Sequence, residues 1–256
     1  DKPLGREKLG YPIGSFGEVF DVLAARIREQ GNKVHLRASV RKIVVEDGQC
    51  TGMEVELREG ETSTRPFDAV IATAPSYIFP KLVPQLPEDY LAKLTSARYM
   101  AAVLVILVLD RPLSHIYWLN VADRSIPFVG VVEQTNLIDP AHYGGKHIVY
   151  LSNYLTTDHP MYRMEQQELL DEYLPHLRKI NSDFDPSWVE TSYHHRVDGA
   201  QPVIGINYSQ HIPSHRTPFE GVYLANTTQI YPEDRGTNYS VRMGRAVARL
   251  VMNDLE

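Results

Sequence analysis

Apolar residues near the amino end of the chain recur at helical spacing. A glycine-rich stretch at 10–17 comes first, and the recurring residues are Phe16, Phe20, Leu23, Ala24 and Ile27. Intervals of three and four residues place these side chains on one side of a helix. Gly31 is a typical residue just beyond a helix end. The pattern therefore predicts a loop followed by a helix that ends near Gly31.

Short runs rich in β-branched residues follow this helix. They lie at 33–36, 40–45 and 53–57, with the turn dipeptides Asp47-Gly48 and Glu59-Gly60 after the second and third. Asp-Gly between two such runs is typical of a β-hairpin. We expect a strand at 33–36 and then a hairpin. The nearly continuous apolar run at 67–75, which Pro75 breaks, predicts a buried strand that ends in a loop.

The middle of the chain is dominated by strand patterns. The apolar run at 101–110 is rich in Val, Leu and Ile, and Arg111-Pro112 follows it. Periodicity alone does not separate a strand from a helix here, but the β-branched content favours a strand buried on both faces. Further strands are expected at 117–121, 128–133, 147–154, 188–195 and 222–226.

Two more helices are expected in the second half of the chain. Leucines and Tyr173 share one helical face at 165–180, and Pro175 should kink or shorten that helix. The apolar stripe of the last helix consists of Tyr239, Met243, Ala246, Val247, Leu250 and Val251. The order of elements predicts an α/β (α+β) fold. Residues 1–80 and 216–256 would form one layer, with a mixed or antiparallel sheet inserted at 81–215.

Composition narrows the function classes. The chain has 256 residues, of which 43% are hydrophobic, so it can bury one large core or two modest ones. A net charge of −6 argues against a nucleic-acid partner, because phosphate binding needs clustered cations. The longest apolar run, 101–109, is too short for a transmembrane helix, which needs about 20 residues. Cys50 is the only cysteine, which fits a reducing compartment, so we expect a cytoplasmic protein.

Several common catalytic motifs are missing from the sequence. Gly10, Gly14 and Gly17 do not form G-x-G-x-x-G, and no phosphate-binding loop or G-x-S-x-G elbow occurs. The ten histidines are scattered, and the adjacent His194 and His195 would point to opposite sides of a strand. No metal site is therefore predicted. The chain begins at Asp1 without an apolar signal core, and we expect it to be part of something longer.

The segment from Gly221 to Ser240 is the most informative. A buried strand ends in small polar residues, and after a loop Gly236 precedes a helix whose first N–H groups lack internal partners. Such a helix start attracts an anion or a carbonyl oxygen, worth about 0.3–1 kcal/mol from the dipole. The alternative is that Thr237 or Asn238 merely caps the helix.

The order of these segments resembles the flavin-containing amine oxidoreductases, which include amine oxidases, protoporphyrinogen oxidases and phytoene desaturases. The resemblance covers the whole chain and is strongest at 221–244. It implies FAD as the cofactor and a partial FAD/NAD(P)-binding-type layer from both chain ends, with an inserted substrate domain. It further implies that the main chain of Val40 recognises the adenine. The residues near the ribose and pyrophosphate would be Ala72, Thr73 and Pro75.

The same resemblance places the last part of the chain at the flavin. Ala225 and Asn226 would face the pyrophosphate. The residues at the start of the final helix, near the flavin ring, would be Arg235, Gly236, Thr237, Asn238 and Tyr239. N–H groups there would stabilise negative charge on the reduced ring.

Two departures from the family pattern limit these expectations. The G-x-G-x-x-G unit is missing, so we expect this chain alone to bind FAD weakly or not at all, and to need an N-terminal FAD-binding segment as its partner. Residues 224–227 read Leu-Ala-Asn-Thr where many relatives have a glycine pair, which is similar to the protoporphyrinogen-oxidase-like branch.

The leading hypothesis is an FAD-dependent oxidoreductase that removes hydride from a C–H bond of a small molecule. No catalytic side chain is assigned, and Tyr154, His195 and Arg235 are candidates to line the substrate cavity. One alternative is a redox-neutral enzyme resembling UDP-galactopyranose mutase, and another is a binding domain that has lost the cofactor. The sequence leaves the substrate, the electron acceptor and assembly into a homo-oligomer open.

Overall fold

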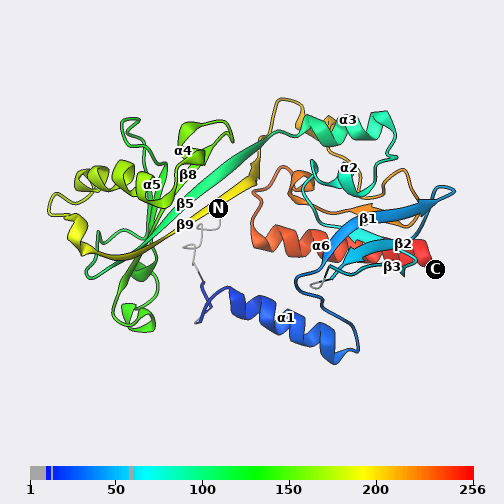
Figure 1. The fold of residues 1–256 in the computed structure, drawn as a ribbon, viewed down its shortest axis with the longest axis horizontal. Coiled ribbons are helices and arrows are strands. Elements are labelled where there is room, and N and C mark those ends of the chain that lie inside the picture. The colour runs from blue at the N-terminus through cyan, green and yellow to red at the C-terminus, as the bar shows by residue number, and fades with distance from the viewer. Residues whose placement is uncertain (1–9, 13, 58–59) are drawn as a thin grey trace, which may run out of the picture. The chain divides into compact units, whose positions relative to one another are not determined.

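The chain divides into two units, each assembled from two separate stretches of sequence. We describe a computed structural model that covers residues 10–12, 14–57 and 60–256 (Figure 1). Unit 1 consists of Asp1–Val34 and Ala101–Asp198, and unit 2 consists of His35–Met100 and Gly199–Glu256. The predicted turn at Glu59-Gly60 falls partly on Glu59, which lies outside the described residues.

Two short parallel strands from distant parts of the sequence form the centre of unit 2. β4 (Val70–Ala72) pairs with β10 (Val222–Leu224), with Val70 opposite Val222 and Ala72 opposite Leu224. The carboxyl ends of parallel strands meet at the same edge. The prediction that 70–75 and 222–226 belong to one layer is confirmed.

Helices cover both faces of this strand pair (Figure 1). Val222 and Leu224 pack into a core with α2 (Phe79–Leu82) and α3 (Glu88–Ser96). Because side chains alternate along a strand, Tyr223 points the other way and packs against α6 (Thr237–Leu255). The predicted C-terminal helix is therefore confirmed, and it is anchored on β10 through Val247 and Val251.

A separate antiparallel sheet in unit 2 contains β1 (Ser39–Glu46), β2 (Gln49–Glu56) and β3 (Thr62–Pro66). The predicted hairpin is confirmed. Asp47 and Gly48 have φ values of 49° and 83°, the two positive angles that a tight hairpin turn requires.

The prediction of a strand at 33–36 is wrong. Those residues are irregular, and Arg37 has a φ of 56°, which interrupts the extended chain before β1. β1 packs in the same core as β4 and β10 through Ile43, but it belongs to a different sheet. Its ladder partner is β2, and the contact of this sheet with the strand pair includes a parallel bridge between Gln49 and Glu220.

Unit 1 is built on a sheet with the strand order β6-β7-β8-β5-β9. The strands are β5 (Tyr99–Leu109), β6 (Trp118–Asn120), β7 (Gly130–Glu133), β8 (His147–Leu155) and β9 (Val189–Pro202). The pairs β5–β8, β7–β8 and β6–β7 are antiparallel. All five predicted strands of this region are confirmed, and β9 extends beyond its predicted end.

One face of this sheet carries the core of unit 1. The helices on it are α4 (Pro160–Arg163) and α5 (Gln166–Tyr173), followed by a 3-10 helix at Leu174–Lys179. The α-helix stops at Tyr173, so the predicted effect of Pro175 is confirmed. Alternate residues of β5 are buried and the others only half-buried. The expectation that β5 is buried on both faces is therefore wrong, because α4, α5 and the 3-10 helix pack on one face and the residues on the other face are only half-buried.

The predicted first helix is α1 (Gly17–Glu29). None of its residues is buried, and its exposed apolar side chains include Phe20 and Leu23. Gly31 follows with a φ of 82°, as expected beyond a helix end. The remaining 3-10 helices are Gln134–Asn136, Pro140–Tyr143, Pro186–Trp188, Tyr208–Gln210 and Thr227–Gln229. No helix within the described ranges has the length and apolar character needed to cross a membrane.

Candidate functional site

The parallel pairing in unit 2 brings two predicted groups of cofactor residues to one edge. Ala72 ends β4, with Thr73 and Pro75 in the loop behind it, while Ala225 and Asn226 follow β10. The N–H of Ala225 donates to the carbonyl oxygen of Ala72 at 2.9 Å, which extends the ladder by one residue. Ligands of open α/β sheets bind at such carboxyl edges. The position of these five residues fits a cofactor site.

The side chain of Asn226 points into the protein and away from any ligand at this edge. Its Nδ2 donates to the carbonyl oxygen of Ala74 at 2.9 Å and to Oγ of Ser76 at 3.2 Å. Its Oδ1 accepts from the N–H of Thr228 at 3.0 Å and from its hydroxyl at 2.6 Å. An amide has two N–H donors and two lone pairs, so every one is used.

The start of α6 has the free donors that the sequence predicted. Gly236 is the N-cap, and no side chain caps the helix. The N–H groups of Tyr239 and Ser240 donate to the carbonyl oxygen of Gly236. Those of Thr237 and Asn238 meet no acceptor in the part of the chain that the structure describes. Neither Thr237 nor Asn238 caps the helix with its side chain. The N–H groups at the start of α6 can therefore bind an anion or a carbonyl oxygen.

Gly236 has an ordinary backbone conformation, with φ at −73°. No left-handed strain requires a glycine here. A Cβ at this position would, however, lie 2.6 Å from Oδ1 of Asn238, so a larger residue must displace that side chain. The glycine matters for space at the helix start rather than for its φ.

The charged neighbours of this helix start are already engaged. The guanidinium of Arg242 lies over the ring of Tyr239, 4.8 Å from its centroid, and pairs with Glu233. The hydrogen bond from Arg242 lowers the pKa of the Glu233 carboxyl. Nε of Arg235 donates to the side-chain oxygen of Gln201 at 3.1 Å when that amide is oriented with its oxygen toward the guanidinium.

Val40 lies in a different sheet from the other predicted cofactor residues. It pairs with Val55 across the β1–β2 ladder, next to a register shift between Val40 and Lys42, and its side chain is 38% exposed. The exposed position leaves its adenine role a prediction.

The two predicted substrate residues share one face of the sheet in unit 1. Tyr154 is 48% exposed, and its neighbours Asn153 and Leu155 are buried on the opposite, helix-covered face. In β9, Gln166 of α5 binds Ser192 at 2.8 Å, so Ser192 faces the helices. By alternation His195 points to the side opposite these helices, and it is exposed.

We call this side of the sheet, which lies opposite α4 and α5, the open face. Its strand positions carry aromatic and aliphatic side chains that the sequence pattern did not single out. They include Trp118, Tyr150, Tyr193, Leu104, Ile106 and Val132. Burial raises the pKa of the Tyr150 hydroxyl, with smaller contributions from neighbouring tyrosines. The sequence carries no signal for this face in β5, because its residues are apolar on both sides and alternate only in burial.

The adjacent histidines face opposite sides, as the sequence predicted. His194 points toward the helices, where burial and the charge of Arg196 lower its pKa and its Nε2 has no partner within the described residues. His195 is on the open face. Among residues 10–12, 14–57 and 60–256, no three His, Cys, Asp or Glu side chains gather into a metal-binding group.

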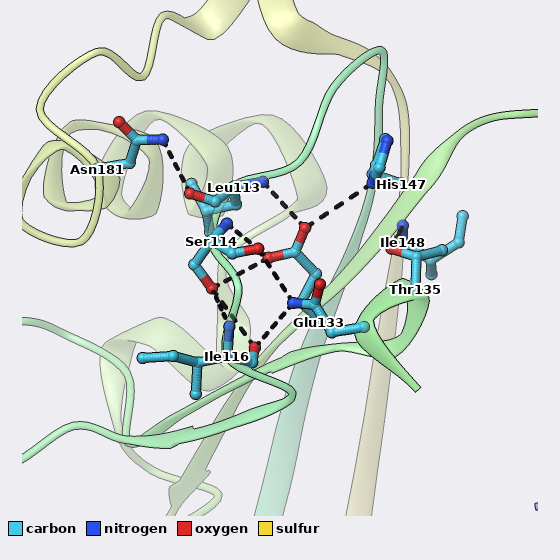
Figure 2. Close-up of polar contacts among 9 residues, drawn as sticks. Leu113, Ser114, Ile116, Glu133, Thr135, His147, Ile148 and Asn181 are labelled. Atoms are coloured by element: carbon cyan, nitrogen blue, oxygen red, sulfur yellow. Dashed lines mark hydrogen bonds and ion pairs between the residues drawn. The ribbon is translucent and has the colours of Figure 1, made fainter. Parts of the chain in front are cut away.

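A buried carboxylate that sequence reasoning missed lies on the helix-covered side of unit 1 (Figure 2). Glu133 is inaccessible to solvent and accepts from the N–H groups of Leu113 and Ser114 at 3.0 and 2.7 Å, and from the Ser114 hydroxyl. Nδ1 of His147 lies 4.0 Å away. Burial raises the pKa of Glu133, which these hydrogen bonds oppose. Glu133 therefore holds the loop after β5 and does not reach the open face.

A hollow of about 890 Å³ in unit 2 lies at the other end of the strand pair. Asp68, Gly221 and Val222 line it beside the Arg216–Asp254 ion pair. These residues precede or begin β4 and β10, so the hollow is at the amino ends of the strands. It does not coincide with the predicted cofactor edge.

Comparison with solved structures finds the same fold in several oxidases and in a mutase. Putrescine oxidase with bound putrescine is 16% identical, with a TM-score of 0.66 over 93% of this chain and 53% of that chain. A protein assigned as a protoporphyrinogen oxidase, from an Exiguobacterium species, is 16% identical, with a TM-score of 0.66 over 90% and 51%. Reduced UDP-galactopyranose mutase is 14% identical, with a TM-score of 0.59 over 81% and 45%.

These likenesses show the fold, and this chain spans about half the length of the proteins it resembles. A search of curated protein sequences finds no match. The profile of the family described as flavin containing amine oxidoreductase matches residues 5–252, nearly the whole chain. The resemblance inferred from the order of segments is thereby confirmed, and the chain belongs to the flavin containing amine oxidoreductase family.

Proposed function

We propose that this chain is the substrate-binding and partial cofactor-binding portion of an FAD-dependent oxidoreductase that takes hydride from a C–H bond of a small molecule. The observation that carries the proposal is the parallel pairing of β4 with β10. It gathers Ala72, Thr73 and Ala225 at one carboxyl edge, followed in sequence by a helix with free N–H groups. The family match supports the same cofactor.

The residues at this edge fit an anionic dinucleotide. The side chains of Ala72 and Ala225 are buried in the two cores of unit 2, so it is their main chain that can reach a ligand at this edge. The first N–H groups of α6 favour negative charge. When bound, FAD supplies the hydride acceptor. The protein's task at Thr237 and Asn238 is to donate main-chain hydrogen bonds that stabilise negative charge on that acceptor.

The open face of unit 1 suits an apolar or aromatic part of a substrate. Tyr154 and Trp118 offer exposed rings, and His195 offers a polar group on the same face. Side chains of this kind orient a substrate and exclude water. The domain division expected from the sequence, with the substrate domain at 81–215, stays a prediction.

The redox-neutral alternative is less well supported. A sugar nucleotide carries a diphosphate, which proteins usually bind with Arg or Lys. None of the open-face positions of β5, β7 and β8 is cationic, and in β9 Arg196 turns to the helix side, where it binds Glu165 and Tyr162. This distribution favours an uncharged or cationic substrate.

Anaerobic reduction of the flavin-loaded protein, expressed from its complete reading frame, tests the proposal. We expect a member of a panel of amines and other hydride donors to bleach the flavin absorbance, with oxidised product formed in equal amount. Protein that binds no flavin would support a domain that has lost its cofactor. Protein active only after prior reduction, with no net oxidation of substrate, would support the redox-neutral alternative.

A further inference from the structure

Three buried polar side chains join the two loops at the carboxyl edge of unit 2. Ser76 follows β4, while Asn226 and Thr228 follow β10. Ser76 and Thr228 are fully buried, and Asn226 is 5% exposed. Buried polar groups of this kind persist only where their partners satisfy them. They therefore define a fixed relation between loops that are distant in sequence.

The hydrogen bonds of these three side chains close into a ring with one direction. The carbonyl oxygen of Ala74 accepts from Asn226, which identifies the amide nitrogen. That nitrogen also donates to Oγ of Ser76. Because the Thr228 hydroxyl donates to Oδ1 of Asn226, the Ser76 hydroxyl must donate to Oγ1 of Thr228, at 3.1 Å.

Two tyrosines brace the ring from outside. The N–H of Ser76 donates to the hydroxyl of Tyr99 at 3.1 Å, and the hydroxyl of Tyr208 donates to the carbonyl oxygen of Thr228 at 2.8 Å. The main chain of both loops is thus held on the inner side. Within 73–76 and 225–228, Thr73 is exposed, and Ala74, Pro75 and Thr227 are half-buried, so these are the positions that can face a ligand.

We infer that Ser76, Asn226 and Thr228 are positioning residues of the proposed flavin site, and that Asn226 acts on the cofactor through the two loops without contacting it. The inference rests on the proposed function. It corrects the sequence-based expectation for Asn226, because a side chain whose four hydrogen-bonding positions are all used inside the protein has none left for a pyrophosphate.

The test uses protein expressed from its complete reading frame and five substitutions. Asn226→Asp keeps the shape but places a carboxylate oxygen against the Ala74 carbonyl. Ser76→Ala and Thr228→Val break the ring elsewhere, and Thr228→Ser keeps the hydroxyl. Thr217→Val is the matched control, because it removes a hydroxyl that also bonds the main chain, near the amino end of β10.

The readouts are the dissociation constant for FAD and the midpoint potential of the bound flavin. We expect Asn226→Asp, Ser76→Ala and Thr228→Val each to weaken FAD binding about tenfold or more. Each should also shift the potential. The Ser76→Ala, Thr228→Val double variant should be little worse than either single one. Thr228→Ser and Thr217→Val should stay within about threefold of wild type.

Two results overturn the inference alone. In the first, Asn226→Asp weakens FAD binding while Ser76→Ala and Thr228→Val behave like Thr217→Val, which would make Asn226 a direct ligand. In the second, the wild type binds FAD and all three ring variants keep its affinity and potential. A wild type that binds no FAD overturns the proposed function, and the inference with it.

Discussion

The side-chain amide of Asn226 donates to the carbonyl oxygen of Ala74 at 2.9 Å, across 152 positions of sequence. This bond fixes the loop behind β10 against the loop behind β4. Sequence reasoning placed both loops at the cofactor, but it could not show which way the amide turns. The structure directs it inward, toward Ser76 and Thr228.

The hydrogen-bond ring of Ser76, Asn226 and Thr228 should contribute to the free energy of unfolding of the 256-residue chain. We expect Ser76→Ala and Thr228→Val each to lower the free energy of unfolding by about 1–3 kcal/mol, because each leaves buried polar groups without a partner. Their coupling in a double-mutant cycle should reach about 0.5–3 kcal/mol. Urea unfolding of the four proteins measures it, and strictly additive losses would contradict a closed ring.

Two glycines of unit 2 should respond to alanine in opposite directions. Gly221 has a φ of 74°, and a Cβ there would lie 2.6 Å from the main-chain oxygen of Asp68, so Gly221→Ala should cost at least about 2 kcal/mol. Gly244 lies inside α6 with open space around it, and Gly244→Ala should add about 0.5–1 kcal/mol. Thermal unfolding distinguishes them. A Gly221→Ala protein as stable as wild type would refute the close approach.

Gly236→Val tests the space at the start of α6. The Asn238 side chain that a Cβ would meet is exposed and can move, so the 256-residue chain should lose little stability. In flavin-loaded protein we expect lower flavin occupancy or a shifted reduction potential, because the valine crowds the ligand side of the helix. Equal occupancy per folded molecule would show that Gly236 is an ordinary turn residue and would remove the assignment of Thr237, Asn238 and Tyr239.

Glu133 should make stability depend on pH in a direction opposite to most carboxylates. Its folded pKa is raised by burial, so its contribution is fully present at low pH and is lost as pH rises through that raised value. The unfolding free energy of wild type minus that of Glu133→Gln should fall as pH rises above the ordinary pKa of glutamate. Carboxyls with a lowered pKa, such as Asp123, are present in both proteins, so their contributions to this difference in unfolding free energy cancel. A difference that is constant or rises with pH would contradict this.

Local sequence patterns predicted the strands with long apolar runs and the helix with a clear apolar stripe. β5, β8 and α6 lie close to their predicted bounds, because long apolar runs and a helical stripe leave few other structures. β3 was missed, since Thr62–Pro66 has no large apolar residue and its pairing with β2 is set by the hairpin beside it. The strand expected at 33–36 failed because the left-handed conformation of Arg37 is not encoded in hydrophobicity.

The sequence did not predict which side chains of the candidate site are buried or in which direction they point. The shared motif order placed Ala72 and Ala225 together, and the β4–β10 pairing confirms that proximity. The burial of Glu133 depends on backbone N–H groups of Leu113 and Ser114, twenty and nineteen positions earlier, which no sequence pattern identifies. The inward turn of Asn226 likewise depends on Ser76, which only the fold brings near.

The flavin content of two purified proteins tests the central claim most directly. One is the 256-residue chain, and the other is the protein expressed from its complete reading frame, both treated with excess FAD and then freed of unbound cofactor. We predict a colourless chain, because it has no G-x-G-x-x-G to hold the pyrophosphate, and a yellow complete protein with near-stoichiometric flavin. A stably yellow 256-residue chain would contradict the partial site, and a complete protein without flavin would contradict the proposed oxidoreductase.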